Sequence, residues 1–160
     1  MFYLKRLRTP EEKFQAAQLH FRPSDIVEFT GASGLPWEFG YTQALVDSDM
    51  LWGGINEKGH MVCAGGFVLT EHLLVPWFAG TEESHTETLG WCRLGRDLTR
   101  LFKTFNKPMS NFVWVENDKT MKWLKILGYN IDTTKEYEFN FGIKFYEFYI
   151  GKKREYIKYV

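Results

Sequence analysis

Residues 111–129 read NFVWVENDKTMKWLKILGY, and this stretch decides the fold. It opens on Asn111 to Val115, where valine and aromatic residues dominate, as is typical of a buried strand. Asp118 follows and begins a helical pattern with apolar side chains three residues apart, namely Met121, Leu124 and Leu127. Gly128 is the residue type expected just past a helix C-terminus. The stretch therefore predicts a buried strand that leads directly into an amphipathic helix.

Upstream of this unit, prolines and capping residues divide the first fifty residues into a short strand and three helices. Thr9 and Pro10 are typical of a helix N-terminus, and Pro23 ends that helix. Ser24 and Asp25 are expected to cap a second, short helix, and Pro36 begins a third that runs to Val46. Between them, Gly31–Gly34 is expected to be a flexible loop that links two helices.

The middle of the chain alternates strands with turn residues. The predicted strands are Met50–Ile55, Met61–Leu69 and Leu73–Ala79. Pro76 lacks an N–H group, so it marks an edge, a bulge or a splay in the third strand. Ser84 and Glu87 stand in a capping-box relation and predict a long helix that continues to Phe105.

Two further strands, residues 130–139 and 141–150, complete the pattern. The order of elements predicts an α/β (α+β) fold, a mixed central sheet of about six to seven strands with helices on both faces. A single domain is expected over residues 1–151, followed by a basic C-terminal tail at 152–160.

Composition excludes several classes of protein. The 160 residues carry 20 Lys and Arg against 20 Asp and Glu, and a net charge of +0 makes nucleic acid an unlikely main partner. Two cysteines, Cys63 and Cys92, do not make a disulfide framework. No segment approaches the ~20 apolar residues that span a bilayer, and no signal sequence is evident. These features predict a cytoplasmic protein with no membrane contact.

The order of elements, and the motif from Asn117 to Tyr129, resemble the GNAT superfamily of N-acetyltransferases. The resemblance implies a GNAT-like acyl-CoA N-acyltransferase fold that uses acetyl-CoA. It also implies cofactor contacts from the strand before the long helix, from the start of that helix and from the asparagine of the motif. The residues concerned are Trp77, Phe78, Ala79, Ser84, His85 and Asn117.

Two chemical devices of that superfamily are missing. Residues 80–90, where a glycine-rich turn would hold the CoA diphosphate, contain Glu82, Glu83 and Glu87 instead. The helical tyrosine that protonates the leaving thiolate is replaced by Leu124. The sequence therefore predicts weak acetyl-CoA binding or none. If transfer occurs, Glu116 is the expected base, with Asn117 beside it as a second catalytic candidate; a solvated carboxylate at a strand end is the alternative reading of Glu116.

A narrower resemblance concerns residues 111–117, 123–128 and 74–81, which are similar to a GNAT-like family of short-tailed phages of the T-seven type. It implies a phage-encoded virion assembly or internal-virion factor with little or no catalysis, present in the host cytoplasm during infection and associated with the virion. We favour this interpretation over an acetyl-CoA-dependent N-acetyltransferase that acts on an amine of a small molecule or protein. A GNAT-type toxin is a third hypothesis. Virion or scaffold proteins would be the partners, bound along the edge of the last strand, Phe141–Ile150, and by the basic tail.

A metal site is not predicted. His60 and Cys63 lie three apart on a strand and therefore point to opposite faces. None of the usual zinc spacings occurs.

Overall fold

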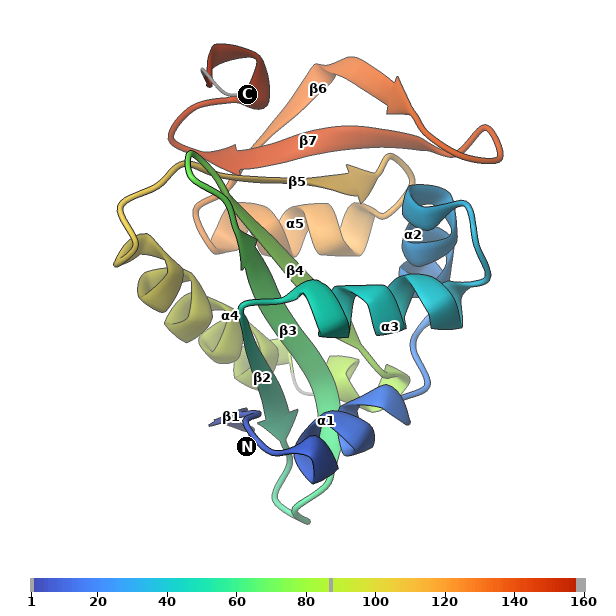
Figure 1. The fold of residues 1–160 in the computed structure, drawn as a ribbon, viewed down its shortest axis with the longest axis vertical. Coiled ribbons are helices and arrows are strands. Elements are labelled where there is room, and N and C mark those ends of the chain that lie inside the picture. The colour runs from blue at the N-terminus through green and yellow to red at the C-terminus, as the bar shows by residue number, and fades with distance from the viewer. Residues whose placement is uncertain (1, 87, 158–160) are drawn as a thin grey trace.

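The computed structural model describes residues 2–86 and 88–157, and its centre is a single seven-stranded sheet (Figure 1). The strands lie in the order β1-β2-β3-β4-β5-β7-β6, and all neighbouring pairs are antiparallel except β4 and β5. Their bounds are β1 Tyr3–Arg6, β2 Met50–Ile55, β3 Met61–Leu69, β4 Leu74–Gly80, β5 Met109–Trp114, β6 Asn130–Glu138 and β7 Lys144–Ile150. The predicted mixed sheet is confirmed.

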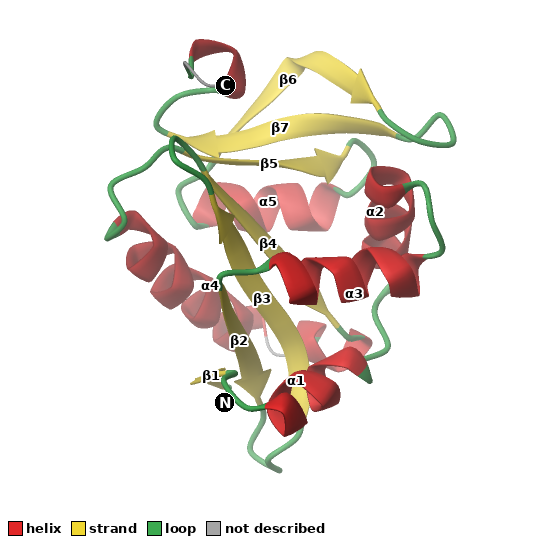
Figure 2. Cartoon of the chain, in the orientation of Figure 1, coloured by secondary structure: helices red, strands yellow, loops and turns green. Residues whose placement is uncertain are grey.

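Helices cover both faces of this sheet (Figure 2). They are α1 Pro10–Ala17, α2 Pro23–Ser33, α3 Trp37–Asp47, α4 Thr88–Lys103 and α5 Asp118–Ile126, with short 3-10 turns η1 Glu82–His85 and η2 Arg154–Tyr156. One apolar cluster joins α4 and α5 to the sheet, and a second joins α1, α2 and α3 to its other face. Within the described residues, no helix has both the length and the apolar character needed to cross a bilayer.

The two parallel strands, β4 and β5, diverge almost as soon as they meet. Their register contains one pair, Leu74 with Met109, and the Leu74 N–H donates to the Pro108 carbonyl at 3.0 Å. Beyond that point Asn111 bridges the gap with its side chain. Its amide donates to the Pro76 carbonyl at 2.8 Å, and its Oδ1 accepts from the Phe112 N–H at 2.9 Å. Of the three possibilities predicted for Pro76, the splay is the one observed.

Helix α2 is longer than the sequence predicted. Its first turn is not capped by a side chain of Ser24 or Asp25, and it continues through Gly31 to Ser33. Gly34 ends it with a φ of 72°, a left-handed conformation that glycine adopts without cost. The loop predicted at residues 31–34 is therefore wrong, because the apolar face of α2 packs on the sheet and on α3 and outweighs the low helix propensity of one glycine.

Two further expectations need correction. Strand β7 is not an edge, because it lies between β5 and β6, so its backbone is not free for pairing with a partner. Ser84 does not begin the long helix. It lies in η1, where its hydroxyl donates to the Thr81 carbonyl at 2.6 Å, and α4 starts at Thr88. Glu87, the other half of the predicted capping box, lies outside the described residues.

The described part of the basic tail is attached to the sheet. The Arg154 guanidinium donates to Ser110 Oγ at 3.0 Å and to the Ser110 carbonyl at 2.9 Å. Its backbone N–H donates to the buried Glu147 carboxylate at 3.0 Å, and Lys153 pairs with Asp132 at 2.7 Å. These contacts make residues 153 and 154 part of the folded domain.

Candidate active site between the diverging strands

A pocket of about 120 Å³ lies where β4 and β5 separate. Trp77 and Phe78 of β4 and Phe112 and Val113 of β5 form its walls. Helices close it from both faces of the sheet: α2 contributes Glu28, Phe29 and Ala32, and α5 contributes Thr120 and Leu124. Because the sheet itself is open here, the pocket contacts elements on both of its sides.

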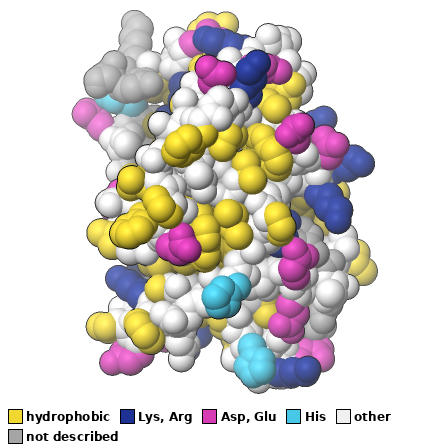
Figure 3. Space-filling model, turned by 90° about the vertical axis from the view of Figure 1, so that its right-hand side faces the viewer, with side chains coloured by type: hydrophobic (Ala, Val, Ile, Leu, Met, Phe, Trp, Pro, Cys, Tyr) yellow, Lys and Arg dark blue, Asp and Glu magenta, His cyan; other side chains and the backbone are white. Residues whose placement is uncertain are grey.

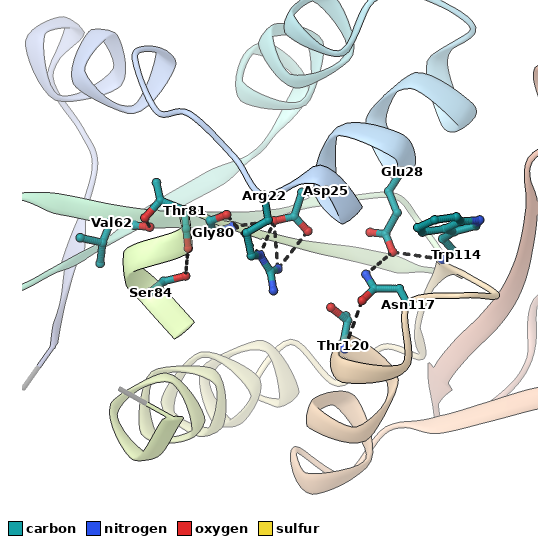
Figure 4. A network of polar contacts seen from close by, with 10 residues as sticks. All are labelled: Arg22, Asp25, Glu28, Val62, Gly80, Thr81, Ser84, Trp114, Asn117 and Thr120. Carbon is teal, nitrogen blue, oxygen red and sulfur yellow. Dashed lines mark hydrogen bonds and ion pairs between the residues drawn. The ribbon is translucent and has the colours of Figure 1, made fainter. Parts of the chain in front are cut away.

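Diverging strands leave backbone N–H groups without strand partners, and two carboxylates of α2 accept from them (Figure 4). The Gly80 N–H, at the end of β4, donates to Asp25 at 3.0 Å. The Trp114 N–H, at the end of β5, donates to Glu28 at 3.1 Å. One helix therefore spans the opening and holds both of its sides.

Glu28 is the titratable group in the pocket. Trp114 N–H and the Asn117 side-chain amide, at 2.8 Å, both donate to its Oε1, and among the described residues no partner is found for Oε2. The residue is partly exposed, but the surrounding side chains desolvate its carboxylate, and this desolvation raises its pKa to about 7. The negative charge of Asp25 adds to the rise, and the Asn117 and Trp114 hydrogen bonds oppose it.

Asp25 is held by a buried ion pair. The Arg22 guanidinium contacts both of its oxygens, with Nη2 at 2.9 Å and 3.0 Å and Nε at 3.1 Å. Arg22 is 8% exposed and Asp25 is 2% exposed, so water screens the pair little. Burial raises the pKa of Asp25, and the Arg22 charge opposes that shift. Arg22 also contacts β4 directly: its backbone N–H donates to the Gly80 carbonyl at 3.2 Å.

The cofactor residues expected from the sequence fall in different surroundings. Trp77 and Phe78 line the pocket, whereas Ala79, on the same face of β4 as Trp77, is fully buried in the apolar cluster that includes residues of α1 and α3. Ser84 is buried in η1 and does not reach the pocket lining. The side chain of His85 lies outside the described residues.

The side chain of Asn117 makes hydrogen bonds to two elements, α5 and α2. Its Oδ1 accepts from the Thr120 N–H at 3.3 Å, which caps α5, while its amide holds Glu28. Glu116 points elsewhere: it is exposed and lines a separate open groove of about 440 Å³ together with Glu82, Asp118 and Lys119. Asn117 also lines this groove, but its hydrogen bond to Glu28 connects it to the pocket, whereas Glu116 makes no such bond among the described residues.

No tyrosine of the described chain takes the place of a proton donor for a leaving thiolate. Leu124 is 1% exposed and lines the pocket at the expected position. Tyr41 and Tyr129 lie in the two cores, away from the lining, and burial raises the pKa of each. Among the described residues, no group of three or more His, Cys, Asp or Glu side chains is placed to hold a metal ion.

The pocket fits the acyl end of a thioester. Hydrogen-bonding directions alternate along a strand, so the N–H and C=O of Phe78 point toward β5, as those of Leu74 do. They therefore face the space between the strands, where an amide of a pantetheine arm could pair with them as another strand would. The walls beside them are apolar.

The turn after β4 does not fit a diphosphate. Ser84 fills the space against Gly80, where an added Cβ would meet its hydroxyl. Glu82 stands on the open groove, and the Glu83 carboxylate accepts from the Asn56 amide at 2.7 Å. Helix termini bind anions through free N–H groups and a positive dipole, but here two carboxylates already stand at the turn.

We expect acetyl-CoA to bind more weakly than the micromolar range. Replacing both Glu82 and Glu83 by Gln removes two negative charges beside the diphosphate position, and should tighten binding roughly tenfold at low salt, since each exposed charge interaction is worth up to ~1 kcal/mol. Titration calorimetry of the parent chain and of the double variant measures both. A micromolar or tighter dissociation constant for the parent chain would contradict this prediction.

No direct signal in the sequence marks Glu28 and Asp25 as site residues. A weak one exists, because Glu28 stands alone among Ile26, Val27 and Phe29 on an apolar helix, where a carboxylate requires a partner. The strand amides that supply the partners lie more than fifty residues away along the chain.

Comparison with known proteins identifies the fold. No protein-family model and no curated protein matches the sequence. Solved structures do match. A protein from Acinetobacter baylyi, provisionally described as an acetyltransferase, is 12% identical with a TM-score of 0.71, over 95% of this chain and 93% of that one. The ribosomal-protein-S18-alanine N-acetyltransferase from Escherichia coli is 14% identical with a TM-score of 0.62, over 99% and 100%.

A third match, the spermidine N-acetyltransferase from Vibrio cholerae in complex with CoA and spermine, is 12% identical with a TM-score of 0.61, over 93% and 94% of the two chains. At such identities the likeness shows a shared fold. The chain therefore has the fold of GNAT acetyltransferases, as the first resemblance implied. The narrower phage family finds no support among these matches.

Proposed function

We propose that this protein is an N-acyltransferase that moves an acyl group from a thioester, such as acetyl-CoA at high concentration, to a primary amine. The single observation that carries the proposal is Glu28, a desolvated carboxylate in the opening between β4 and β5 whose Oε2 has no hydrogen-bond partner among the described residues. The shared fold supports the same reaction class.

A primary alkylammonium, with a pKa near ~10, must lose a proton before its nitrogen can attack a carbonyl carbon. Glu28 Oε2 accepts that proton, and a base with a pKa of about 7 does so effectively near neutral pH. The amine nitrogen then bonds to the acyl carbon, the carbon–sulfur bond breaks, and the thiolate leaves. The nitrogen gives its second proton to solvent, which leaves a neutral amide. Since Leu124 cannot donate a proton, solvent protonates the thiolate.

Trp114 and Asn117 keep the base in position. Both donate to Glu28 Oε1, so Oε2 remains directed to the amine, and the carboxylate cannot turn away without breaking two hydrogen bonds. Asn117 is thereby a positioning residue rather than a proton carrier.

Replacing Glu28 by Gln should lower acyl transfer about 100-fold or more, because general base catalysis typically contributes 10²–10⁴-fold. Gln keeps an oxygen that accepts from Trp114 and Asn117, so the fold should remain. The measurement is the steady-state release of free thiol from millimolar acetyl-CoA with a panel of primary amines.

Glu38→Gln is the matched control, since Glu38 is an exposed glutamate on α3 outside the pocket, and its rate should equal that of the parent chain. Glu116→Gln tests the residue that the sequence favoured. A full rate in the Glu28 variant together with a large loss in the Glu116 variant would transfer the role of base to Glu116.

A non-catalytic role in phage virion assembly is the second candidate. The filled turn after β4 and Leu124 favour its non-catalytic part, because each replaces a group that acyl transfer would use, while the phage role rests on the narrower sequence resemblance alone. This candidate predicts that the full chain transfers no acyl group to any amine and copurifies with virion or scaffold proteins from infected cells.

A further inference from the structure

The outer part of the pocket is made of aromatic rings. Phe139, between β6 and β7, packs edge-to-face on Phe112 of β5 with ring centroids 5.0 Å apart, and lies 5.2 Å from the ring of Phe145. All three rings line the pocket, with Phe29 and Trp77 opposite on α2 and β4. Phe139 is 41% exposed, so it stands at the mouth.

This mouth is fixed in place. The N–H of Asn140 and its side-chain amide both donate to the Gly31 carbonyl, at 3.1 Å and 2.9 Å, which fastens the β6–β7 turn to the end of α2. Figure 3 shows the side of the molecule on which these two segments lie, and hydrophobic side chains gather across it. Phe141, at the turn, is 72% exposed and has a φ of 57°, a conformation that costs energy for a bulky residue.

Charge is scarce in the pocket. Glu28 is the only charged side chain among the described residues that line it. A carboxylate surrounded by rings favours one ammonium group, both by direct pairing and by cation–π attraction to the ring faces. The open volume of about 120 Å³ is close to that of an engineered apolar cavity, ~150 Å³, that takes up benzene.

We infer that the acceptor is an arylalkylamine, a primary amine on a short alkyl chain that carries a single aromatic ring. The inference rests on the proposed function and specifies its substrate. The ring sits among Phe112, Phe139 and Phe145, and the ammonium meets Glu28 Oε2. A polyamine carries several charges, and the described lining offers it one carboxylate and no further acceptor of opposite charge.

The test measures binding without any acyl donor, by quenching of tryptophan fluorescence at pH 8. Three probes are compared: 2-phenylethylamine, 2-phenylethanol, which has the ring without the charge, and spermidine, which has charge without the ring. We expect 2-phenylethylamine to bind at least tenfold more tightly than either of the others. Glu28→Gln should abolish its advantage over 2-phenylethanol, and Phe139→Ala should weaken both ring compounds about tenfold.

Phe14→Ala is the control, because Phe14 is 66% exposed on α1 and is not part of the pocket, so it should change none of the three affinities. Spermidine binding as tightly as 2-phenylethylamine, or a Phe139 variant with unchanged affinities, would overturn the inference. If spermidine or another non-aromatic amine is acylated in a Glu28-dependent way while 2-phenylethylamine does not bind, the inference fails and the proposed function stands. If 2-phenylethylamine binds as expected and no amine is acylated, the ligand class stands and the transfer function fails.

Discussion

Replacing Arg22 by alanine should lower the free energy of unfolding by about 3–5 kcal/mol, the cost of leaving one partner of a buried ion pair uncompensated. Asp25 is 2% exposed and receives three of its contacts from the Arg22 guanidinium. Without that cation, the one donor to Asp25 that remains among the described residues is the Gly80 N–H, at 3.0 Å. The variant also loses the hydrogen bond from the Arg22 Nε–H to the Gly80 carbonyl at 3.3 Å. The N–H of Gly80, which donates to Asp25, and its carbonyl are therefore both affected at the end of β4.

Urea denaturation at pH 7, with stabilities taken from the midpoints and slopes, measures the effect. The double variant Arg22→Met with Asp25→Asn should recover part of the loss, since asparagine is neutral and can still accept from Gly80. Arg8→Ala is the matched control: Arg8 is exposed, and its change should stay within about 0.5 kcal/mol. A loss below 1 kcal/mol for Arg22→Ala would mean that the pair does not hold α2 to β4.

The hydrophobic pattern and the capping residues correctly predicted the helices and strands whose formation depends mainly on neighbouring residues. The strand and helix of residues 111–129 were found because Leu124 and its neighbours repeat with the helical period, and Gly128, with a φ of 98°, ends that helix as expected. Pro76 indicated an edge, a bulge or a splay because it has no N–H. In the structure β4 diverges from β5 at this residue, so no N–H is needed on the side that faces β5.

Tertiary pairing decided what the sequence could not show. The sequence around Gly31 is typical of a loop, but α2 continues through it because its apolar face packs on the sheet and on α3. Asn140 of the β6–β7 turn also donates to the Gly31 carbonyl. The position of β7 between β5 and β6 depends on which strands meet, and neighbouring sequence does not contain that information. Glu116 follows the motif directly and was chosen for that reason, whereas Glu28, eighty-six residues before Trp114, reaches the pocket only through the fold.

The stability of the protein should fall by about 2–3 kcal/mol between pH 5 and pH 8 through Glu28 alone. Burial raises the pKa of Glu28 from 4.5 to about 7, so between these values the folded chain binds a proton that the unfolded chain releases. The stabilising contribution is therefore complete below pH 4.5 and is lost as the pH rises through 7. Each unit of pKa difference corresponds to about 1.4 kcal/mol.

Glu28→Gln isolates this contribution, because glutamine stays neutral and keeps the acceptor for Trp114 and Asn117. The variant should have nearly the stability of the parent chain at pH 5 and exceed it at pH 8, as measured by urea denaturation at half-unit intervals. Asp132→Asn is the control: salt-bridging to Lys153 and hydrogen bonds from Thr134 lower the pKa of Asp132 to about 2, so its contribution is lost only in acid and its difference from the parent should be constant from pH 5 to pH 8. A constant difference for Glu28→Gln as well would place the titration of Glu28 outside this range, and a carboxylate already ionised at pH 5 would be too weak a base for the transfer proposed.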